Sequence, residues 1–373
     1  MAMELAKKGS ALAATLHPIV RKSIGELVRS MNCYYSNLIE GHDTHPRDID
    51  RALRGDLSTN QKQRNLQLEA KAHIEVQRLI DEGRTPAIKP STNFMHWVHH
   101  EFCSRLPEEL LWVTNPDTGK KLKLAAGKFR ESEVAVGRHV PPLAKNLERF
   151  MRRFEEAYDP DKLSQVQQVI AIAASHHRLV WIHPFLDGNG RVVRLFSHAW
   201  LLDIGIGSSL WSVSRGLARN VDEYKARLMA ADSPRKGDLD GRGNLSHNEL
   251  VNFCRFFLKA AIDQIDFMSS LIDTDNVLAR MSIHIQEEVA FKRLPKGSIS
   301  LLREAWLRGE FKRGEAVQIT GYKERAAREI LSTLLAKNYL VSDNERGPVR
   351  LAFPLEAIER WLPKLYPTTS KSE

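Results

Sequence analysis

The chain has 373 residues, of which 42% are hydrophobic, and 55 Lys and Arg against 46 Asp and Glu give a net charge of +9. This length can bury a sizeable core in two or three domains, so we expect a globular protein. The sequence has no run of about 18 apolar residues and no signal peptide at residues 1–10, so we expect no membrane contact and a cytoplasmic location. The positive charge favours polyanionic partners such as nucleotide phosphates or nucleic acid.

The three cysteines argue against a disulfide framework and against a zinc site. They are odd in number, lie far apart and follow no ligand spacing. We therefore expect buried free thiols at Cys33, Cys103 and Cys254.

Helical periodicity dominates the sequence, with apolar residues at intervals of three and four and few strand-like stretches. The fold class is therefore predicted to be mainly α. Helices are expected over 19–40, 61–82, 141–157 and 165–181, with Gly- and Pro-rich loops over 84–90, 115–120, 127–142 and 233–243.

The pattern changes near residue 298 to three short helices followed by a β-hairpin, which is typical of a winged helix-turn-helix. The helices are expected at 300–307, 315–319 and 323–337, and the hairpin at 339–343 and 349–353. The expected organisation is an N-terminal helical region (1–90), a central domain (91–275), a basic linker (276–297), the winged helix (298–366) and a polar tail (367–373).

Residues 183–194 read His-Pro-Phe-Leu-Asp-Gly-Asn-Gly-Arg-Val-Val-Arg and interrupt a helical stretch. An apolar helix ends before His183, and a new helix begins at about Gly190. A helix that restarts after glycines points several backbone N–H groups in one direction, which makes a phosphate site that a Cβ would obstruct. Phe185 is expected to point inward and anchor the loop.

The charged residues of this loop have separate chemical uses. Arg191 and Arg194 are three residues apart, so both guanidinium groups can reach one anion. Asp187 at the mouth of the loop suits Mg²⁺ bridging phosphates. His183, with an ordinary pKa near ~6.5, suits proton abstraction from a hydroxyl. A Gly-Asn-Gly turn alone is usually an ordinary helix connection, but the whole string favours a phosphate site.

The string resembles the signature of the Fic family, His-x-Phe-x-(Asp/Glu)-Gly-Asn-Gly-Arg-x-x-Arg, with every defined position present. The resemblance implies an α-helical Fic core and transfer of AMP from ATP to a Tyr, Thr or Ser hydroxyl of a protein. It assigns the base to His183 and the Mg²⁺ ligand to Asp187. It assigns the α-phosphate to Gly188, Asn189 and Gly190, and the β- and γ-phosphates to Arg191 and Arg194.

Two further segments extend the resemblance over most of residues 30–260. Residues 127–142 resemble the family's flap, a β-hairpin that pairs with an extended target through Val134, Ala135, Val136 and Gly137. Without the family, this segment would equally be an ordinary surface hairpin. Tyr224 lies where such proteins often line the adenine pocket, although a core tyrosine is equally consistent with the sequence.

Residues 36–41, Ser-Asn-Leu-Ile-Glu-Gly, end an amphipathic helix, with Gly41 as its stop signal. Glu40 alone would be a surface acid. The segment resembles the family's inhibitory helix (about 30–41 here), which implies that Glu40, one turn after Ser36, pairs with Arg194 and competes with ATP. Some relatives use this Glu to remove AMP, and relatives with an N-terminal inhibitory helix often form homodimers.

The C-terminal segment leaves a second hypothesis open: a DNA-binding transcriptional regulator that uses the Fic site as a nucleotide sensor. Its cations are Lys323, Arg325, Arg328, Arg346 and Arg350. Glu324 and Glu329 on the same predicted helix weaken a role in following DNA phosphates, so the sequence slightly favours a segment that packs on the core or recruits a protein.

Overall fold

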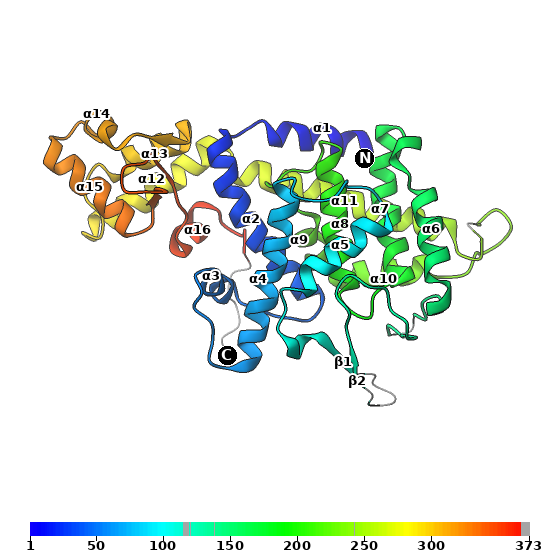
Figure 1. Ribbon diagram of the computed structural model, residues 1–373. Coiled ribbons are helices and arrows are strands. Elements are labelled where there is room, and N and C mark those ends of the chain that lie inside the picture. Colours follow the sequence, from blue (N-terminus) through cyan, green and yellow to red (C-terminus); the bar gives the residue numbers. More distant parts are fainter. Residues whose placement is uncertain (115–118, 120, 138, 242, 367–373) are drawn as a thin grey trace. The chain divides into compact units, whose positions relative to one another are not determined.

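The computed structural model describes residues 1–114, 119, 121–137, 139–241 and 243–366 (Figure 1). The chain divides into two compact units. The first comprises Met1–Ser10 and Arg29–Gln264, and the second comprises Ala11–Val28 and the chain from Ile265 onwards. The predicted fold class is confirmed, because helices make up most of both units.

The helices up to the site loop are α1 (Ala2–Ala13), α2 (Pro18–Ile39), α3 (Pro46–Leu53), α4 (Gln61–Asp81), α5 (Thr92–Cys103), α6 (Leu147–Ala157) and α7 (Gln165–Ile182). After it come α8 (Asn189–Asp203), α9 (Val213–Arg219), α10 (Val221–Ala231), α11 (His247–Leu271), α12 (Thr274–Ala290), α13 (Ser298–Arg308), α14 (Ala316–Thr320), α15 (Glu324–Ala336) and α16 (Leu355–Trp361). Short 3-10 helices cover Glu108–Leu111, Ala144–Asn146, Pro160–Lys162 and Arg313–Glu315.

Most predicted helices begin and end within a residue or two of the structure, because their caps are local. The Ser164 side chain accepts from the Gln167 N–H, and the Gln167 side chain returns a bond to the Ser164 backbone, which is a capping box at the start of α7. The segment 141–157 is the exception. Its helix α6 begins only at Leu147, after a 3-10 helix at Ala144–Asn146.

Helix α8 is the centre of the first unit. Every residue of α8 from Arg191 to Leu201 is buried, and α4, α5, α7 and α9 all contact it. A helix that is covered on all sides usually presents apolar residues all round, as Phe196 and Trp200 do here. The buried cations of α8 are therefore the exceptions that need partners.

The strands form two small sheets. In the first unit, β1 (Trp112–Thr114) pairs antiparallel with β2 (Lys121–Lys123), in register Val113 to Leu122. In the second unit, β3 (Glu310–Phe311), β4 (Leu340–Val341) and β5 (Val349–Leu351) form a sheet in the order β3-β5-β4. The three predicted helices and the hairpin of residues 298–366 are thus present, with β3 and α16 in addition. Their assignment as a winged helix-turn-helix stays a prediction.

The structure differs from the predicted linker over 276–297. Most of that segment is helix α12, which packs against α13 and α16. Val277, Met281 and Ile285 recur every four residues and are buried on one face, and the side chain of Asp273 caps the helix through the Asn276 N–H. The basic residues from Lys292 onwards suggested a linker, but they only follow the helix end.

Two sequence-level expectations can be compared with the described residues. Cys33, Cys103 and Cys254 are buried thiols outside any disulfide, as predicted. Across the described ranges, no helix combines the length and the apolar character needed to cross a bilayer.

Candidate active site

The loop that carries the predicted site joins α7 to α8 through two left-handed residues. His183 caps the C-terminus of α7 at φ 50°, and Gly188 precedes the first residue of α8 at φ 80°. A left-handed histidine is rarely found unless its surroundings hold it, and such residues gather at functional sites. The predicted helix restart at about Gly190 is confirmed, since α8 begins at Asn189.

The loop is closed by the side chain of Asn189. Its Oδ1 accepts from the Phe185 N–H at 2.9 Å, and its Nδ2 donates to the Phe185 carbonyl at 2.9 Å. Phe185 is fully buried, so it anchors the loop as expected. Because the Asn189 amide is used in this way, a phosphate at the start of α8 would meet its backbone N–H.

His99 of α5, which is fully buried, supports the same loop. Its ring stacks on Phe185 with centroids 3.9 Å apart. Its Nδ1 accepts from the Gly127 N–H at 2.8 Å, so the proton lies on Nε2, which donates to the Asp187 carbonyl at 3.2 Å. Burial lowers the pKa of His99 to about 4, so the ring keeps this tautomer at neutral pH.

The imidazole of His183 is held neutral. Burial, followed by the positive charge of Arg130, lowers the pKa of His183 to about 4. At neutral pH the ring therefore has a free lone pair and can accept a proton. Nδ1 is buried, which leaves Nε2 as the nitrogen available to a reactant.

Arg130 is a positioning residue that the sequence did not single out within the segment 127–142. Its Nε donates to the His183 carbonyl at 2.8 Å, and its backbone N–H donates to the Pro184 carbonyl at 2.9 Å. Its Nη1 and Nη2 donate to the carbonyls of Ser132 at 3.0 Å and Pro142 at 2.5 Å. This buried guanidinium ties the segment 127–142 to the backbone of His183.

Arg194 is engaged by the end of helix α2. Its Nε donates to Ser36 Oγ at 2.9 Å, and its Nη2 donates to the Ser36 carbonyl at 3.1 Å and to Glu40 Oε1 at 2.5 Å. Glu40 follows the last helical residue, and Gly41 takes φ 83°, as the predicted stop signal requires. A Cβ on Gly190 would clash with Oε1 of Glu40, so the glycine permits this approach.

The carboxylate of Glu40 stays ionised in this setting. Loss of water around it raises its pKa, but the charges of Arg194 and Arg191 outweigh that effect, so the pKa of Glu40 lies below its usual value. The ion pair is therefore fully charged at neutral pH.

Arg191 is engaged by a different acid, Glu69 of α4. Arg191 Nη2 lies 2.5 Å from Glu69 Oε1 and 3.3 Å from Nδ1 of His42. The hydrogen bond that His42 Nδ1 donates to Glu69 raises the pKa of His42. The face of the Phe102 ring lies 5.2 Å from the guanidinium carbon of Arg191. Neither Glu69 nor His42 was expected at the site.

Asp187 lies exposed at the mouth of the loop, where its Oδ1 accepts from the Gly188 N–H at 2.6 Å. Within the described part of the chain, no three His, Cys, Asp or Glu side chains gather closely enough to hold a metal ion. Mg²⁺ commonly binds through one or two carboxylates and substrate phosphates. A single exposed carboxylate beside the backbone N–H groups that begin α8, where a phosphate could bind, therefore fits that ion.

The flap differs from the predicted β-hairpin. Its only regular pairing among the described residues is a bridge between Val136 and His139, which exchange two backbone hydrogen bonds of 3.0 Å around Gly137. Val134 and Ala135 belong to no strand. The opposite arm enters Pro141 and Pro142, which have no N–H groups to continue a ladder.

Tyr224 is a core residue in this structure, with 3% of its surface exposed. Its hydroxyl lies 2.8 Å from His176 Nε2, and His176 Nδ1 lies 2.8 Å from Ser197 Oγ. Because the Ser197 hydroxyl donates to the Val193 carbonyl, His176 Nδ1 donates to Ser197 and the Tyr224 hydroxyl donates to His176. Burial raises the pKa of Tyr224 to about 12.

Replacing Tyr224 by Phe is expected to lower the free energy of unfolding by about 1–2 kcal/mol, because His176 Nε2 loses its donor in a buried site. The affinity for ATP should stay within twofold. Urea denaturation and calorimetric titration measure the two quantities. Weaker ATP binding at unchanged stability would instead place Tyr224 against the nucleotide.

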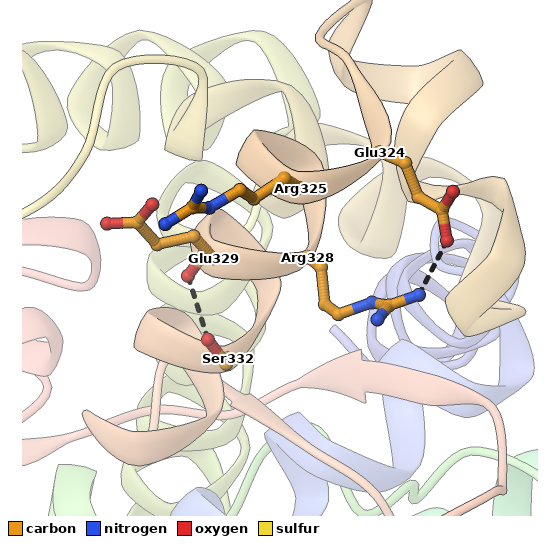
Figure 2. A pocket seen from close by; sticks show the side chains of 5 residues that line it. All are labelled: Glu324, Arg325, Arg328, Glu329 and Ser332. Atoms are coloured by element: carbon orange, nitrogen blue, oxygen red, sulfur yellow. Dashed lines mark hydrogen bonds and ion pairs between the residues drawn. The ribbon is translucent and has the colours of Figure 1, made fainter.

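The predicted DNA-binding surface lies on α15 of the second unit and carries both signs of charge. Figure 2 shows Glu324, Arg325, Arg328, Glu329 and Ser332 lining a shallow pocket on this helix. Arg328 Nη2 lies 2.5 Å from Glu324 Oε1, and both side chains are about three-quarters exposed. Arg350 on β5 is likewise paired, with Asp343 at 2.6 Å.

Comparison with known sequences matches residues 92–201 to the model of the Fic/DOC family. A protein named protein adenylyltransferase Fic from Nematostella vectensis is 42% identical over 176 residues, which are 46% of this chain and 37% of that protein. The protein of the same name from Drosophila erecta is 40% identical over 82 residues, 22% of this chain and 17% of that protein. The matches thus span less than half the length of these curated relatives.

Solved structures share the fold at low sequence identity. A Fic domain-containing signalling protein from Bacteroides thetaiotaomicron gives a TM-score of 0.52 at 18% identity and covers 72% of this chain and 95% of that chain. A Fic family protein from Desulfovibrio desulfuricans gives 0.51 at 15% identity, over 94% of this chain and 95% of that chain. Fic-1 from C. elegans gives 0.54 at 16% identity, over 74% of this chain and 72% of that chain. Residues 92–201, with the loop between α7 and α8, therefore match the Fic/DOC family model, and the chain shares the fold of solved Fic proteins.

Proposed function

We propose that this protein transfers AMP from ATP to a Tyr, Thr or Ser hydroxyl of a target protein or of itself. The observation that supports this most directly is the layout of residues 183–194. A neutral His183 ends one helix, a left-handed Gly188 opens the next, and the guanidinium groups of Arg191 and Arg194 follow on its first turns. A base beside a phosphate nest and two arginines suits nucleotidyl transfer.

The reaction assigns each group one task. The target hydroxyl oxygen attacks the α-phosphorus of ATP, and its proton passes to Nε2 of His183. A new oxygen–phosphorus bond forms, the bond between the α-phosphorus and the bridging oxygen breaks, and pyrophosphate leaves. The backbone N–H groups at Asn189 and Gly190 would hold the α-phosphate, joined by the Gly188 N–H once Asp187 Oδ1 releases it. Arg191 and Arg194 would hold the β- and γ-phosphates.

The Mg²⁺ that Asp187 would hold neutralises phosphate charge when it is bound. The chain itself contributes the exposed carboxylate of Asp187 and the backbone that fixes the loop. His99 supports this orientation, because it donates to the Asp187 carbonyl.

We further propose that Glu40 inhibits the transfer. Oε1 of Glu40 accepts a hydrogen bond from Nη2 of Arg194, and this donor would otherwise be available to the γ-phosphate of ATP. The Glu40 side chain is 32% exposed and lies beyond the end of α2, so it can withdraw into solvent without unfolding a helix. Once withdrawn from Arg194, the same carboxylate could orient a water that removes AMP from a modified target.

Incubation of purified protein with ATP labelled at the α-phosphate, with and without Mg²⁺, tests the proposal. Label should become covalently attached to protein in the Glu40→Gly variant and should be absent from the double variant Glu40→Gly, His183→Ala. Mass spectrometry of labelled lysate proteins then identifies the target. Label that appears equally in the double variant would contradict catalysis at this site.

A DNA-binding regulator is the second candidate, and the exposed Arg325 and Arg328 on α15 are the observation in its favour. The pairing of Arg328 with Glu324 reduces the charge available to phosphates. Salt-dependent binding to a specific duplex that is lost in Arg325→Ala would support this candidate. Duplex binding that does not depend on sequence would count against it.

A further inference from the structure

The two arginines of the site are held by acids with different freedom to move. Glu40, which engages Arg194, is 32% exposed beyond the end of α2. Glu69, which engages Arg191, is 5% exposed and lies inside α4, a helix of 21 residues. The first acid can leave its arginine, whereas the second can leave only if α4 moves.

Glu69 is fixed on its other side as well. Both carboxylate oxygens of Glu69 lie 3.0 Å from Nδ1 of His42, and Oε1 also lies 2.5 Å from Nη2 of Arg191. A buried carboxylate needs such partners, because an unpaired buried charge is strongly unfavourable. The cluster of Glu69, His42 and Arg191 therefore has one well-defined arrangement.

Glu69 leaves other donors of Arg191 unused. An arginine side chain offers five N–H donors in a fixed fork. Nε of Arg191 is buried and, among the described residues, has no hydrogen-bond partner. The Phe102 ring, whose centroid lies 5.2 Å from the guanidinium carbon, is a further contact of the group. An anchored guanidinium whose remaining donors are not used by Glu69 can serve a second acceptor.

We propose that Glu69 is a positioning residue, which holds the Arg191 guanidinium permanently in place to receive a distal phosphate of the nucleotide. It acts through Arg191 and does not itself touch the substrate. The two acids thus have opposite effects: Glu40 competes with the nucleotide for Arg194, and Glu69 prepares Arg191 for it. This inference rests on the proposed function, since it assumes that the site binds ATP.

The test compares ATP and AMP binding by calorimetric titration in the Glu40→Gly protein, with and without Glu69→Gln. Loss of the anchor should weaken ATP binding roughly tenfold, the effect of losing one hydrogen bond to a charged group. AMP lacks the distal phosphates, so its affinity should stay within twofold. Glu75→Gln is the matched control, because Glu75 lies on the same helix in a half-buried pair with Arg78 and should leave both affinities unchanged.

The other possible results of this titration each contradict positioning by Glu69 or the proposed function. Equal losses for ATP and AMP would indicate a general structural role, and unchanged or tighter ATP binding would contradict positioning by Glu69. If Glu69→Gln does not fold by circular dichroism, His42→Gln, at a half-exposed position, should weaken ATP over AMP in the same direction, and its failure to do so would overturn the proposal. A Glu40→Gly parent that binds no ATP would instead contradict the proposed function.

Discussion

Replacing Glu40 by Gly is expected to raise self-modification with labelled ATP by roughly 10- to 100-fold over the wild type. Two unit charges 4 Å apart attract by up to about 4 kcal/mol at an effective dielectric of 20, and the cost of desolvation offsets part of that. Since Oε1 of Glu40 lies 2.5 Å from Nη2 of Arg194, this attraction is what ATP must displace. Removing the carboxylate frees Arg194 for the γ-phosphate.

Two further variants separate the charge of Glu40 from the other contacts that hold Arg194. Glu40→Gln keeps the length of the side chain and loses its charge, so it should give most of the increase seen with Gly. Ser36→Ala removes one acceptor of Arg194 and leaves the ion pair, so its effect should be several-fold smaller. Equal labelling of the wild type and Glu40→Gly would refute inhibition by Glu40.

The charges of Glu40 and Arg194 also determine how the proposed inhibition depends on pH. Because the folded-state pKa of Glu40 is lowered, the pair is present above the ordinary carboxyl range and is lost only as the pH falls through that lowered value. Inhibition should therefore stay constant from about pH 6 to 8. On the proposed inhibition, release at neutral pH would require movement of the segment that carries Glu40, because the carboxylate stays charged there.

The local parts of the site could be predicted from the sequence because each is encoded within a few residues. The glycines, the inward Phe185 and the helix start at Asn189 all belong to one loop. The contact between Glu40 and Arg194 spans 154 positions, and only the resemblance to a known family suggested it. Composition and periodicity alone gave Glu40 no partner.

The partners that were missed are buried charges on other elements. Glu69 occupies a helix position that reads as an ordinary polar residue, and Arg130 lies in a loop that reads as surface. A sequence pattern does not show whether a charge is buried, since Glu and Arg are usually exposed. The burial of α8 is what forces Arg191 and Arg194 to find acids on α4 and at the end of α2.

The fold could be predicted where helix periodicity and helix caps agree. The predictions failed where basic charge or an expected hairpin was given more weight than the available hydrogen bonds. The basic residues after Ala290 suggested a linker where α12 is buried. The hairpin expected within residues 127–142 is limited to the bridge between Val136 and His139, because the opposite arm contains Pro141 and Pro142 and cannot continue a ladder.

Replacing His183 by Ala in the Glu40→Gly protein is expected to reduce the rate of AMP transfer by roughly 10²- to 10⁴-fold, the contribution of a positioned general base. The affinity for ATP should remain, because the nest at Gly188 and the two arginines are unchanged. Single-turnover labelling and calorimetric titration measure the rate and the affinity. A variant that retains more than a tenth of the rate would show that another group accepts the proton.

The pH dependence of the Glu40→Gly enzyme identifies the same base. Burial and Arg130 lower the pKa of His183 to about 4, so the neutral ring persists through the range in which an exposed histidine becomes protonated. The rate should therefore hold down to about pH 5 and fall as the pH passes through about 4, provided that tryptophan fluorescence shows a folded protein. Arg130→Met removes the nearby charge, so the pH at which the rate falls should rise toward the ordinary pKa of histidine. If the rate of the Glu40→Gly parent instead falls near pH 6.5, His183 is solvated in the working enzyme. The loop would then open before the proton is transferred.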